Sequence, residues 1–444
     1  MHVQTVVIQN LRCFREATVG LRTPTGSATD PALVPNVTLI LGDNGSGKTT
    51  LLRAVALAVL GPLLSSSGFV PHNLIRRERR MRSTKAPAPA AGPQSASAAV
   101  DLTLHWQDLG ERKPSDTEKA VQVRAEIVRR GDIESVSAPA DHFEEINGLY
   151  QDDSPAFLLV GYGASRRVET TRNFEPPGAR GLFRYDRVAG LFSDSVPLTP
   201  LGTWLPRLME SNPGRFRQVV DLLDTLLPAE CRFTGKQEDK EYVFDFHGVP
   251  LPFVALSDGY RAYIAWLADL LRHVVHNCPD GVKLTENRGV VLVDEIDLHL
   301  HPSWQRTILP TLSKTLPNLQ FIVTSHSPII AGTLEAWNIV RVTMDETGVA
   351  RAERPLIDVH GLNSEQILMG GYFDLGSTRA PSAELEINAL SRRVQAGDKA
   401  ASVMLLKRLA GTLSVEEARA VRNSPKAGPK AGTDRRPAKK GRRA

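Results

Sequence analysis

The chain has 444 residues, 41% of them hydrophobic, which suffices for one large or two smaller globular units with a sizeable core. No apolar run approaches the ~20 residues that a membrane-spanning helix needs, so the composition argues against a membrane-embedded protein. The net charge of +5 is uneven: the tail 422–444 holds nine Lys or Arg and one Asp, hence +8, which leaves −3 for the rest of the chain.

The N-terminus indicates the compartment, and the cysteines indicate whether disulfides or a zinc site are expected. Residues 1–10 alternate apolar and polar side chains and have neither the basic start nor the apolar block of a signal peptide, so we expect a cytoplasmic protein. Cys13, Cys231 and Cys278 form no Cys-x-x-Cys pair and indicate neither a disulfide framework nor a zinc site.

The predicted elements alternate between strands and helices, which favours an α/β fold. Short apolar runs predict strands, and longer amphipathic runs predict helices. The expected strands are 3–8, 37–41, 102–106, 121–128, 290–293 and 319–323, and the expected helices are 48–60, 219–227 and 262–275. The segment 83–99 is rich in Ala, Pro and Ser and predicts a disordered loop, whereas the pattern beyond residue 357 is mostly helical.

A phosphate-binding loop is predicted between strand 37–41 and helix 48–60. Residues 42–49 read GDNGSGKT and match G-x-x-x-x-G-K-[ST] at every defined position. The N–H groups of such a loop, and the start of the following helix, face phosphate oxygens, so a chance glycine turn is the weaker alternative. We expect Lys48 to reach the β- and γ-phosphates of ATP and Thr49 to bind Mg²⁺. The predicted nucleotide-binding residues are Gly42, Asp43, Asn44, Gly45, Ser46, Gly47, Lys48, Thr49 and Thr50.

Two acids end the apolar strand 290–293. In a P-loop fold this strand lies near the P-loop strand, which would place Asp294 at the metal and Glu295 where it can orient or deprotonate a water molecule. An acidic strand end that merely caps a helix is the alternative. Asp297 either faces an opposing subunit or is itself a helix N-cap.

Three histidines follow these strands. His326 comes just after strand 319–323, where an imidazole can sense or stabilise charge that develops at the γ-phosphate; a structural role is the alternative. His299 and His301 form an H-x-H pair, but no third ligand stands at a suitable spacing, so helix packing is favoured over metal binding.

A second anion site is predicted where residues 256–261, LSDGYR, open the helix 262–275. A Ser side chain and a Gly N–H at a helix start suit a phosphate group. Because the P-loop already serves this chain's own nucleotide, Ser257 and Gly259 are candidates for capping the γ-phosphate of ATP held by another copy. A plain N-cap formed by Ser257 or Asp258 is the alternative.

The order of these motifs resembles the ABC-type ATPase heads, and more closely the RecF/SMC/OLD-like branch of AAA/ABC ATPases found in DNA repair and anti-phage defence. Four segments carry the likeness: 10–14 (NLRCF), 161–167 (GYGASRR), 256–261 and 294–302 (DEIDLHLHP). Residues 364–368 together with 378–379 also resemble the ATPase subunits of Septu-type defence systems.

The resemblance identifies residues 256–261 as the signature segment of such heads. It implies an α/β P-loop head with a mixed sheet, a β-rich N-terminal lobe and a helical lobe, about 200–288, that carries this signature. It also implies Mg²⁺-dependent ATP hydrolysis by a homodimer that holds two ATP molecules between P-loop and signature. In this reading Glu295 is the catalytic base, His326 the switch histidine, and Asp294 the Mg²⁺ ligand beside Thr49. The head is expected to span 1–395, followed by a helical segment, 396–421, and a disordered basic tail, 422–444.

The sequence departs from this pattern in two places. The signature has Ser-Asp-Gly where transporter ATPases have Ser-Gly-Gly, and no Q-loop glutamine is evident: Gln151 is one candidate, and Arg166 or Arg167 could serve instead.

Three functions compete. An ATP-gated head with a nuclease or other effector partner is favoured over a nucleotide-dependent scaffold with slow turnover and over a transporter ATPase subunit. DNA is a candidate partner because the tail and the arginines in 76–82 could neutralise phosphates, although solvated disorder explains the tail equally well.

Overall fold

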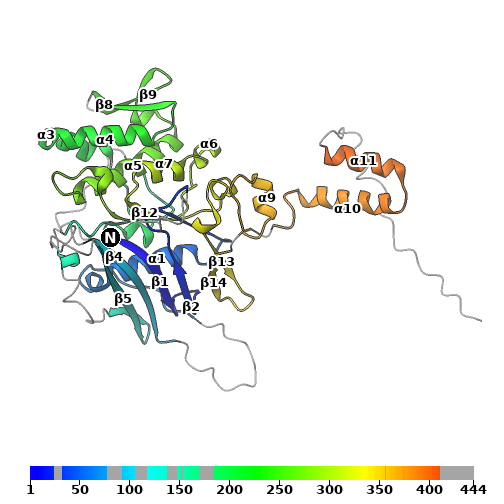
Figure 1. The fold of residues 1–444 in the computed structure, drawn as a ribbon, viewed down its shortest axis with the longest axis horizontal. Helices are drawn as coiled ribbons and strands as arrows, with labels where there is room; N and C mark the ends of the chain where they lie inside the picture. The colour runs from blue at the N-terminus through cyan, green and yellow to red at the C-terminus, as the bar shows by residue number, and fades with distance from the viewer. Residues whose placement is uncertain are drawn as a thin grey trace, which may run out of the picture. The chain divides into compact units, whose positions relative to one another are not determined.

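The computed structural model of the protein describes residues 1–24, 33–77, 93–105, 118–137, 148–151, 154–169, 184–239, 241–355, 357–373 and 375–410. The chain divides into two compact units, Met1–Asp374 and Leu375–Ala444. The described part of the second unit contains α10 (Pro381–Gln395) and α11 (Lys399–Leu409) (Figure 1). The predicted tail 422–444 lies outside the described residues.

A six-stranded mixed sheet forms the centre of the first unit. Its strand order is β14-β13-β3-β12-β11-β7, and all neighbouring strands are parallel except β13 and β14. The strands are β3 (Val37–Leu41), β7 (Leu159–Tyr162), β11 (Gly289–Val293), β12 (Leu319–Thr324), β13 (Ile339–Met344) and β14 (Ala350–Glu353). The predicted mixed α/β sheet is confirmed.

The central strands are mostly apolar because both faces of the sheet are covered. Ile40, Leu292 and Ile322 belong to the core that surrounds α1 (Lys48–Leu60). Their neighbours in the chain, such as Leu39 and Val323, belong to the core shared with α5 (Asp258–Asn277) on the opposite face. Alternate side chains of a strand point to opposite faces, so a strand buried on both faces has few polar positions.

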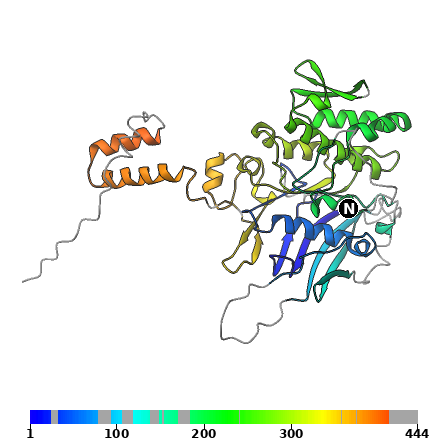
Figure 2. The same cartoon turned by 180° about the vertical axis from the view of Figure 1, so that it is seen from behind.

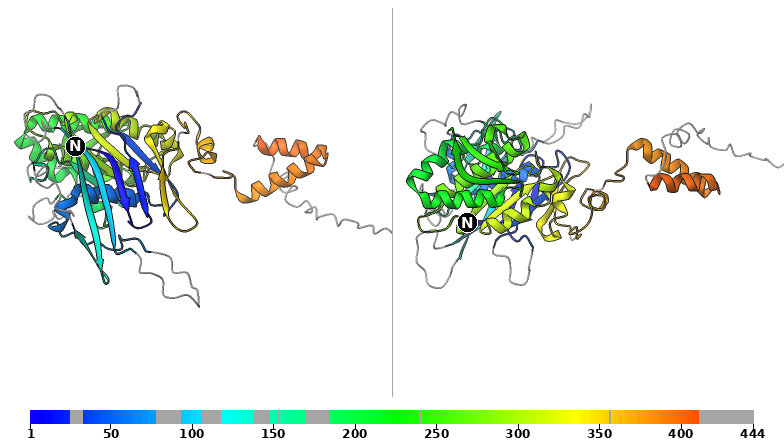
Figure 3. Two further views of the ribbon diagram at one scale, coloured as in Figure 1. Left: turned by 60° about the horizontal axis from the view of Figure 1, so that its bottom comes forward. Right: turned by 90° about the horizontal axis from the view of Figure 1, so that it is seen from above.

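A five-stranded antiparallel sheet forms the predicted β-rich N-terminal lobe. Its order is β2-β1-β4-β5-β6, and α1 packs against β4 and β5 on one side and against the central sheet on the other (Figures 1 and 3). The strands are β1 (His2–Gln9), β2 (Glu16–Gly20), β4 (Ser95–His105), β5 (Glu118–Arg130) and β6 (Ile133–Ser137).

This lobe corrects one prediction. The segment 83–99 is not a loop throughout, since β4 begins at Ser95 and pairs with both β1 and β5. Small residues such as Ala96 and Ala98 are buried in this strand, where they allow close packing; residues 83–92 lie outside the described part.

Among the described helices, one segment is long and apolar enough to cross a membrane, Lys48–Ser65, which contains α1. Of this segment 72% is buried inside the protein, as in a helix of a globular core.

The signature lobe combines helices with a small sheet (Figure 2). The helices are α3 (Leu201–Ser211), α4 (Pro213–Leu226) and α5, and the antiparallel strands are β8 (Cys231–Glu238), β9 (Glu241–Phe246) and β10 (Val249–Pro252). Of these helices, α4 packs against β8. The lobe is helical, as expected, and it also contains a three-stranded sheet that the sequence did not predict. Phe233 and Phe244 stack at 4.9 Å between ring centroids and bury one face of the hairpin. The prediction of a helical lobe overlooks such strands, in which buried and exposed side chains alternate.

The described residues of the first unit also contain several short helices. They are α6 (Pro302–Gln305), α7 (Ile308–Thr315), α8 (Pro328–Ala331) and α9 (Ser364–Met369). Of these, α6 and α8 follow strands β11 and β12 and therefore lie close to the site described below.

Candidate functional site

Four neighbouring strands of the central sheet end at the same edge. β7, β11, β12 and β3 are adjacent and parallel, and Val293 is in register with both Tyr162 and Val323. The segments that follow these strands are 163–167, 294–297, 325–328 and the P-loop 42–49. Sequence motifs separated by more than 200 residues are thus brought to one edge, where ligands bind in parallel α/β sheets.

The P-loop has the conformation that its glycines permit. Gly47 has φ 116°, and a Cβ there would lie 2.7 Å from the Cys13 Sγ and 2.9 Å from the Phe14 ring. Only glycine fits this position. Segment 10–14 therefore supports the P-loop directly, which explains its place among the recognisable segments.

The loop fits a phosphate group. The Lys48 Nζ donates to the carbonyl oxygens of Gly42 and Asp43, at 2.8 and 3.0 Å, and thus lies across the loop. The Ser46 hydroxyl is buried and has no hydrogen-bond partner. An unpartnered buried hydroxyl is costly, so a bound acceptor such as a phosphate oxygen would satisfy it.

The acid pair is joined to the P-loop by two threonines. Asp294, 5% exposed, accepts hydrogen bonds from the Thr49 hydroxyl at 2.7 Å and from the Thr324 hydroxyl at 2.6 Å. The Glu295 N–H donates to the same Thr324 oxygen at 2.7 Å. Thr324, the last residue of β12, was missed by the sequence-based prediction.

Asp294 and Thr49 also fit a magnesium ion. Mg²⁺ is commonly held by one or two protein oxygens together with phosphate oxygens and water, and the two side chains meet at 2.7 Å. Within the described ranges no group of three His, Cys, Asp or Glu could hold a metal by itself, so a bound phosphate would have to complete the site.

Charge at this edge is dominated by carboxylates. Burial lowers the pKa of Lys48, while Asp294, Glu295, Asp43 and Asp297 act to raise it. Asp297 carries a buried Oδ1 without a partner. The N-cap alternative for Asp297 is wrong, because the next helix, α6, begins at Pro302 with His301 as its cap.

His326 follows β12 and is half-buried at the same edge. Its neighbour Ser327 caps α8 by accepting hydrogen bonds from the N–H groups of Ile329 and Ile330. This cap fixes the backbone next to the imidazole. The role of His326 as a switch residue stays a prediction.

The candidate Q-loop residues are separated by β7. Gln151 precedes this strand and is exposed. Arg166 and Arg167 follow it, but they differ: Arg166 donates to the Glu295 carbonyl oxygen at 2.6 Å, whereas Arg167 is 59% exposed and pairs with Glu169. Of the three residues, Arg166 is therefore the one in contact with the acid pair.

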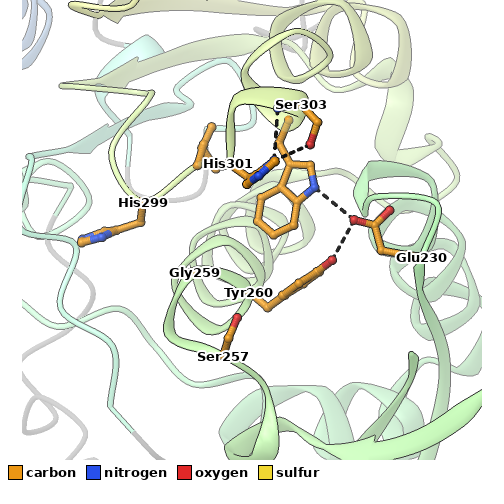
Figure 4. Close-up of a pocket in the computed structure, with 9 residues that line it drawn as sticks. Glu230, Ser257, Gly259, Tyr260, His299, His301 and Ser303 are labelled. Carbon is orange, nitrogen blue, oxygen red and sulfur yellow. Dashed lines mark hydrogen bonds between the residues drawn. The ribbon is translucent and has the colours of Figure 1, made fainter. Parts of the chain in front are cut away.

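The signature residues line a separate pocket, with a volume of about 540 Å³ (Figure 4). Ser257 is the N-cap residue of α5, yet its side chain forms no capping hydrogen bond, so capping does not account for its hydroxyl. A Cβ at Gly259 would lie 3.2 Å from the His299 carbonyl oxygen, which favours glycine there. The pocket is lined by Glu230, Ser257, Gly259, Tyr260, His299, Leu300, His301, Ser303 and Trp304. No P-loop residue belongs to it.

In the H-x-H pair, His301 has a structural role at the start of α6. The His301 Nδ1 lies 2.8 Å from the Ser303 hydroxyl and caps α6, and Trp304 packs against Tyr260 with ring centroids 4.4 Å apart. Figure 4 shows the imidazole of His299 lying apart from that of His301, an arrangement that does not suit a shared metal.

Two family models match the chain. Residues 145–331 match the model described as "AAA domain, putative AbiEii toxin, Type IV TA system", and residues 5–124 match a second model described as "AAA domain". Among solved structures, an SMC head bound to the C-winged helix domain of ScpA is 16% identical, with a TM-score of 0.47, and the match covers 80% of this chain and 97% of that one.

Named relatives are similar over different shares of their length. The Retron Ec83 probable ATPase of Escherichia coli is 38% identical over 29% of this chain and 24% of its own. The Septu protein PtuA of Bacillus mycoides is 25% identical over 86% of this chain and 46% of its own. The chain thus spans less than half the length of these two proteins.

A third relative is similar over most of both chains. The Retron Vc95 probable ATPase of Vibrio cholerae is 41% identical, and the match covers 68% of each chain. With the P-loop, the acid pair and the central sheet in place, the chain belongs to the AAA-domain P-loop ATPases, in the family of this retron ATPase.

Proposed function

We propose that this protein binds Mg²⁺-ATP at the edge formed by β3, β12, β11 and β7, and hydrolyses it to ADP and phosphate. The observation that carries the proposal is the chain of hydrogen bonds from Thr49 through Asp294 and Thr324 to the Glu295 N–H. It ties the phosphate loop to the acid pair, as phosphoryl transfer to water requires.

Each residue has a role that follows from its place. Lys48 and the Ser46 hydroxyl hold phosphate oxygens, and Thr49 with Asp294 holds the metal. When bound, Mg²⁺ neutralises charge on the β- and γ-phosphates. Glu295 orients the attacking water and accepts its proton, and His326 donates a hydrogen bond toward the γ-phosphate oxygens.

We extend the proposal to an ATP-dependent homodimer. The signature pocket contains no P-loop residue, and the Ser257 hydroxyl forms no capping hydrogen bond. These observations support a signature that serves the nucleotide of a second copy. Two chains would then hold two ATP molecules between them.

Asp294→Asn tests hydrolysis, with the exposed Asp280→Asn as its matched control. We expect the Asp294 variant to lose ATP turnover by at least ~100-fold, since the carboxylate supports both the metal and Thr324. The control should keep wild-type turnover. If the wild type binds ATP but does not turn it over, the alternative of a nucleotide-dependent scaffold is favoured. Turnover by Asp294→Asn would contradict the assignment of Asp294 to the active site.

The cellular role is proposed as an ATP-gated component of DNA repair or anti-phage defence that works with an effector chain. The names of the retron and Septu relatives support it. Phage plating on cells that express the chain with its neighbouring genes tests it. Protection that Glu295→Gln abolishes would support defence, and equal plating with and without the genes would contradict it.

DNA contact has its own test. Retention of DNA should fall steeply with salt if basic residues neutralise phosphates, and deletion of 422–444 should remove that dependence. An unchanged salt dependence after the deletion would show that the tail does not contact DNA.

A further inference from the structure

Arg166 lies beside Glu295 because their strands are neighbours. β7 and β11 are parallel, with Tyr162 in register with Val293, so the segments that follow the two strands run next to each other. The Arg166 Nη2 donates a hydrogen bond to the Glu295 main-chain oxygen at 2.6 Å. The contact therefore fixes the backbone of Glu295 and leaves its carboxylate free for chemistry.

Both residues of this contact have unusual backbones. Glu295 has φ 48° and Arg166 has φ 27°, in the left-handed region that non-glycine residues seldom adopt. Such conformations persist only where the surroundings enforce them, and they cluster at functional sites. The hydrogen bond from Arg166, together with that from the Glu295 N–H to Thr324, holds Glu295 on both sides of its Cα.

The same guanidinium also contacts the signature helix. It lies over the ring of Trp266, a residue of α5, with 5.8 Å between the Arg166 Cζ and the ring centroid. Trp266 is 2% exposed and in turn packs edge-on against Tyr162, at 6.2 Å. Because α5 begins at the signature, Arg166 connects the helix that carries Ser257 to the backbone of Glu295.

Acidic residues near Arg166 favour the charged form of its side chain. The carboxylates of Asp297, Asp294 and Glu295 favour its positive charge, and the buried Asp297 Oδ1 has no hydrogen-bond partner of its own. Burial lowers the pKa of Arg166 to about 10, opposed by these acids, so the side chain stays charged at neutral pH.

We propose that Arg166 is a positioning residue that holds Glu295 in its left-handed conformation and couples that conformation to the signature helix α5. Binding of a second copy's nucleotide at Ser257 would then be communicated through Trp266 and Arg166 to the catalytic carboxylate. The proposal rests on the proposed function, since it assigns how the ATPase site is assembled.

The test compares Arg166→Gln and Arg166→Lys with Arg167→Gln, a matched control whose side chain is exposed. We expect Arg166→Gln to lower kcat by about 100-fold, the scale of a misplaced catalytic group, with the KM for ATP unchanged within about 2-fold. Arg166→Lys should have a higher kcat than Arg166→Gln, because it keeps the positive charge. Its kcat should stay below that of the wild type, because lysine lacks the planar group that contacts Trp266. Arg167→Gln should match the wild type.

Double variants show whether Arg166 acts through its partners. Adding Arg166→Gln to Glu295→Gln, or to Ser257→Ala, should lower kcat no further than the more severe single change, because the residues act as a unit. Multiplied losses in both pairs would overturn the proposal. So would wild-type kcat in Arg166→Gln, or a KM that rises in step with the loss of kcat.

Amide hydrogen exchange separates this proposal from the proposed function. In the nucleotide-free protein, Arg166→Gln should speed exchange in 294–298 while exchange in β5 stays unchanged, which also shows that the variant is folded. If the wild type shows no ATP turnover, the proposed function fails, but the exchange experiment still tests the positioning role of Arg166. Unchanged exchange in 294–298 would overturn that role.

Discussion

Thr324 bridges the two acids of the candidate active site, since one oxygen donates to Asp294 and accepts from the Glu295 N–H. Thr324→Val keeps the shape and removes both bonds. We expect a loss of ~1–3 kcal/mol in the free energy of unfolding, the cost of buried groups left unpaired. ATP turnover should fall by about 10-fold or more, since each misplaced group raises the barrier.

Thermal unfolding and steady-state ATPase assays measure the two effects. The exposed helical Thr225→Val is the control and should change neither. A Thr324→Val protein with wild-type turnover would show that the bridge does not position Glu295.

Gly47 is constrained by its backbone and by its neighbours. Its φ is 116°, and an added Cβ would meet the Cys13 Sγ at 2.7 Å, whereas Gly68, with φ 75°, has open space around it. Gly47→Ala should therefore lower the free energy of unfolding by about 1–3 kcal/mol and abolish ATP binding. Gly68→Ala, which carries the backbone strain alone, should lose less stability and keep binding.

Chemical denaturation and titration with a fluorescent ATP analogue measure these outcomes. Equal effects of the two alanine variants would contradict the contact between segment 10–14 and the P-loop.

At the residue scale, the sequence predicted residues that belong to continuous motifs. Lys48 and Thr49 begin α1 after the glycine loop, Asp294 and Glu295 directly follow β11, and the structure brings them together. Thr324 could not be predicted in the same way. Its function depends on the register of β12 against β11, and no local pattern determines this register.

At the scale of elements, a buried charge cluster joins α5 to β7. Asp269 of α5 accepts a hydrogen bond from the Tyr162 hydroxyl at 2.9 Å and one from the Thr199 N–H at 3.1 Å. Burial acts to raise the pKa of Asp269, but His273, Arg272 and the Thr199 N–H hold that pKa well below its usual range. The carboxylate is therefore charged and stabilising at neutral pH.

Asp269→Asn should lower the free energy of unfolding by ~3 kcal/mol at pH 7, because it leaves the partners of a buried charge unsatisfied. A carboxyl whose pKa is lower in the folded state stabilises above its unfolded pKa of ~3.9 and loses that contribution as the pH falls further. The difference between wild type and variant should therefore narrow below about pH 4. Stability curves that stay parallel from pH 7 to pH 3 would contradict this assignment.

Elements with a simple hydrophobic pattern were predicted well. The bounds of β3 and α1 agree with the expected 37–41 and 48–60, since an apolar run, a glycine loop and an apolar helix follow each other directly. The hairpin β8–β9 was missed. Its alternating pattern is interrupted by a register shift between Phe233 and Gln237, next to Gly235, so that no unbroken strand signal is present.

At the scale of the whole molecule, the proposed ATPase site needs a second copy of the chain. Among the described residues, the P-loop 42–49 and the signature pocket have no residue in common. Ser257→Arg should block the approach of a second copy by bulk and charge. We expect it to keep ATP binding at the P-loop while it loses turnover by about 100-fold, and a mass measurement should find monomer at every ATP concentration.

Ser211→Arg, at the exposed end of α3, is the matched control and should dimerise and turn over ATP as the wild type does. Wild-type turnover by a monomeric Ser257→Arg protein would show that the signature is not part of the active site.

An ATPase site completed by two chains requires that ATP changes the mass of the protein, and the Glu295→Gln variant with Mg²⁺-ATP is the protein to measure. We predict that ATP converts the monomer into a dimer, and that this variant remains dimeric with uncleaved ATP while the wild type turns over and dissociates. A mass that never responds to ATP, together with turnover that survives the loss of Glu295, would contradict both the dimer and the catalytic base.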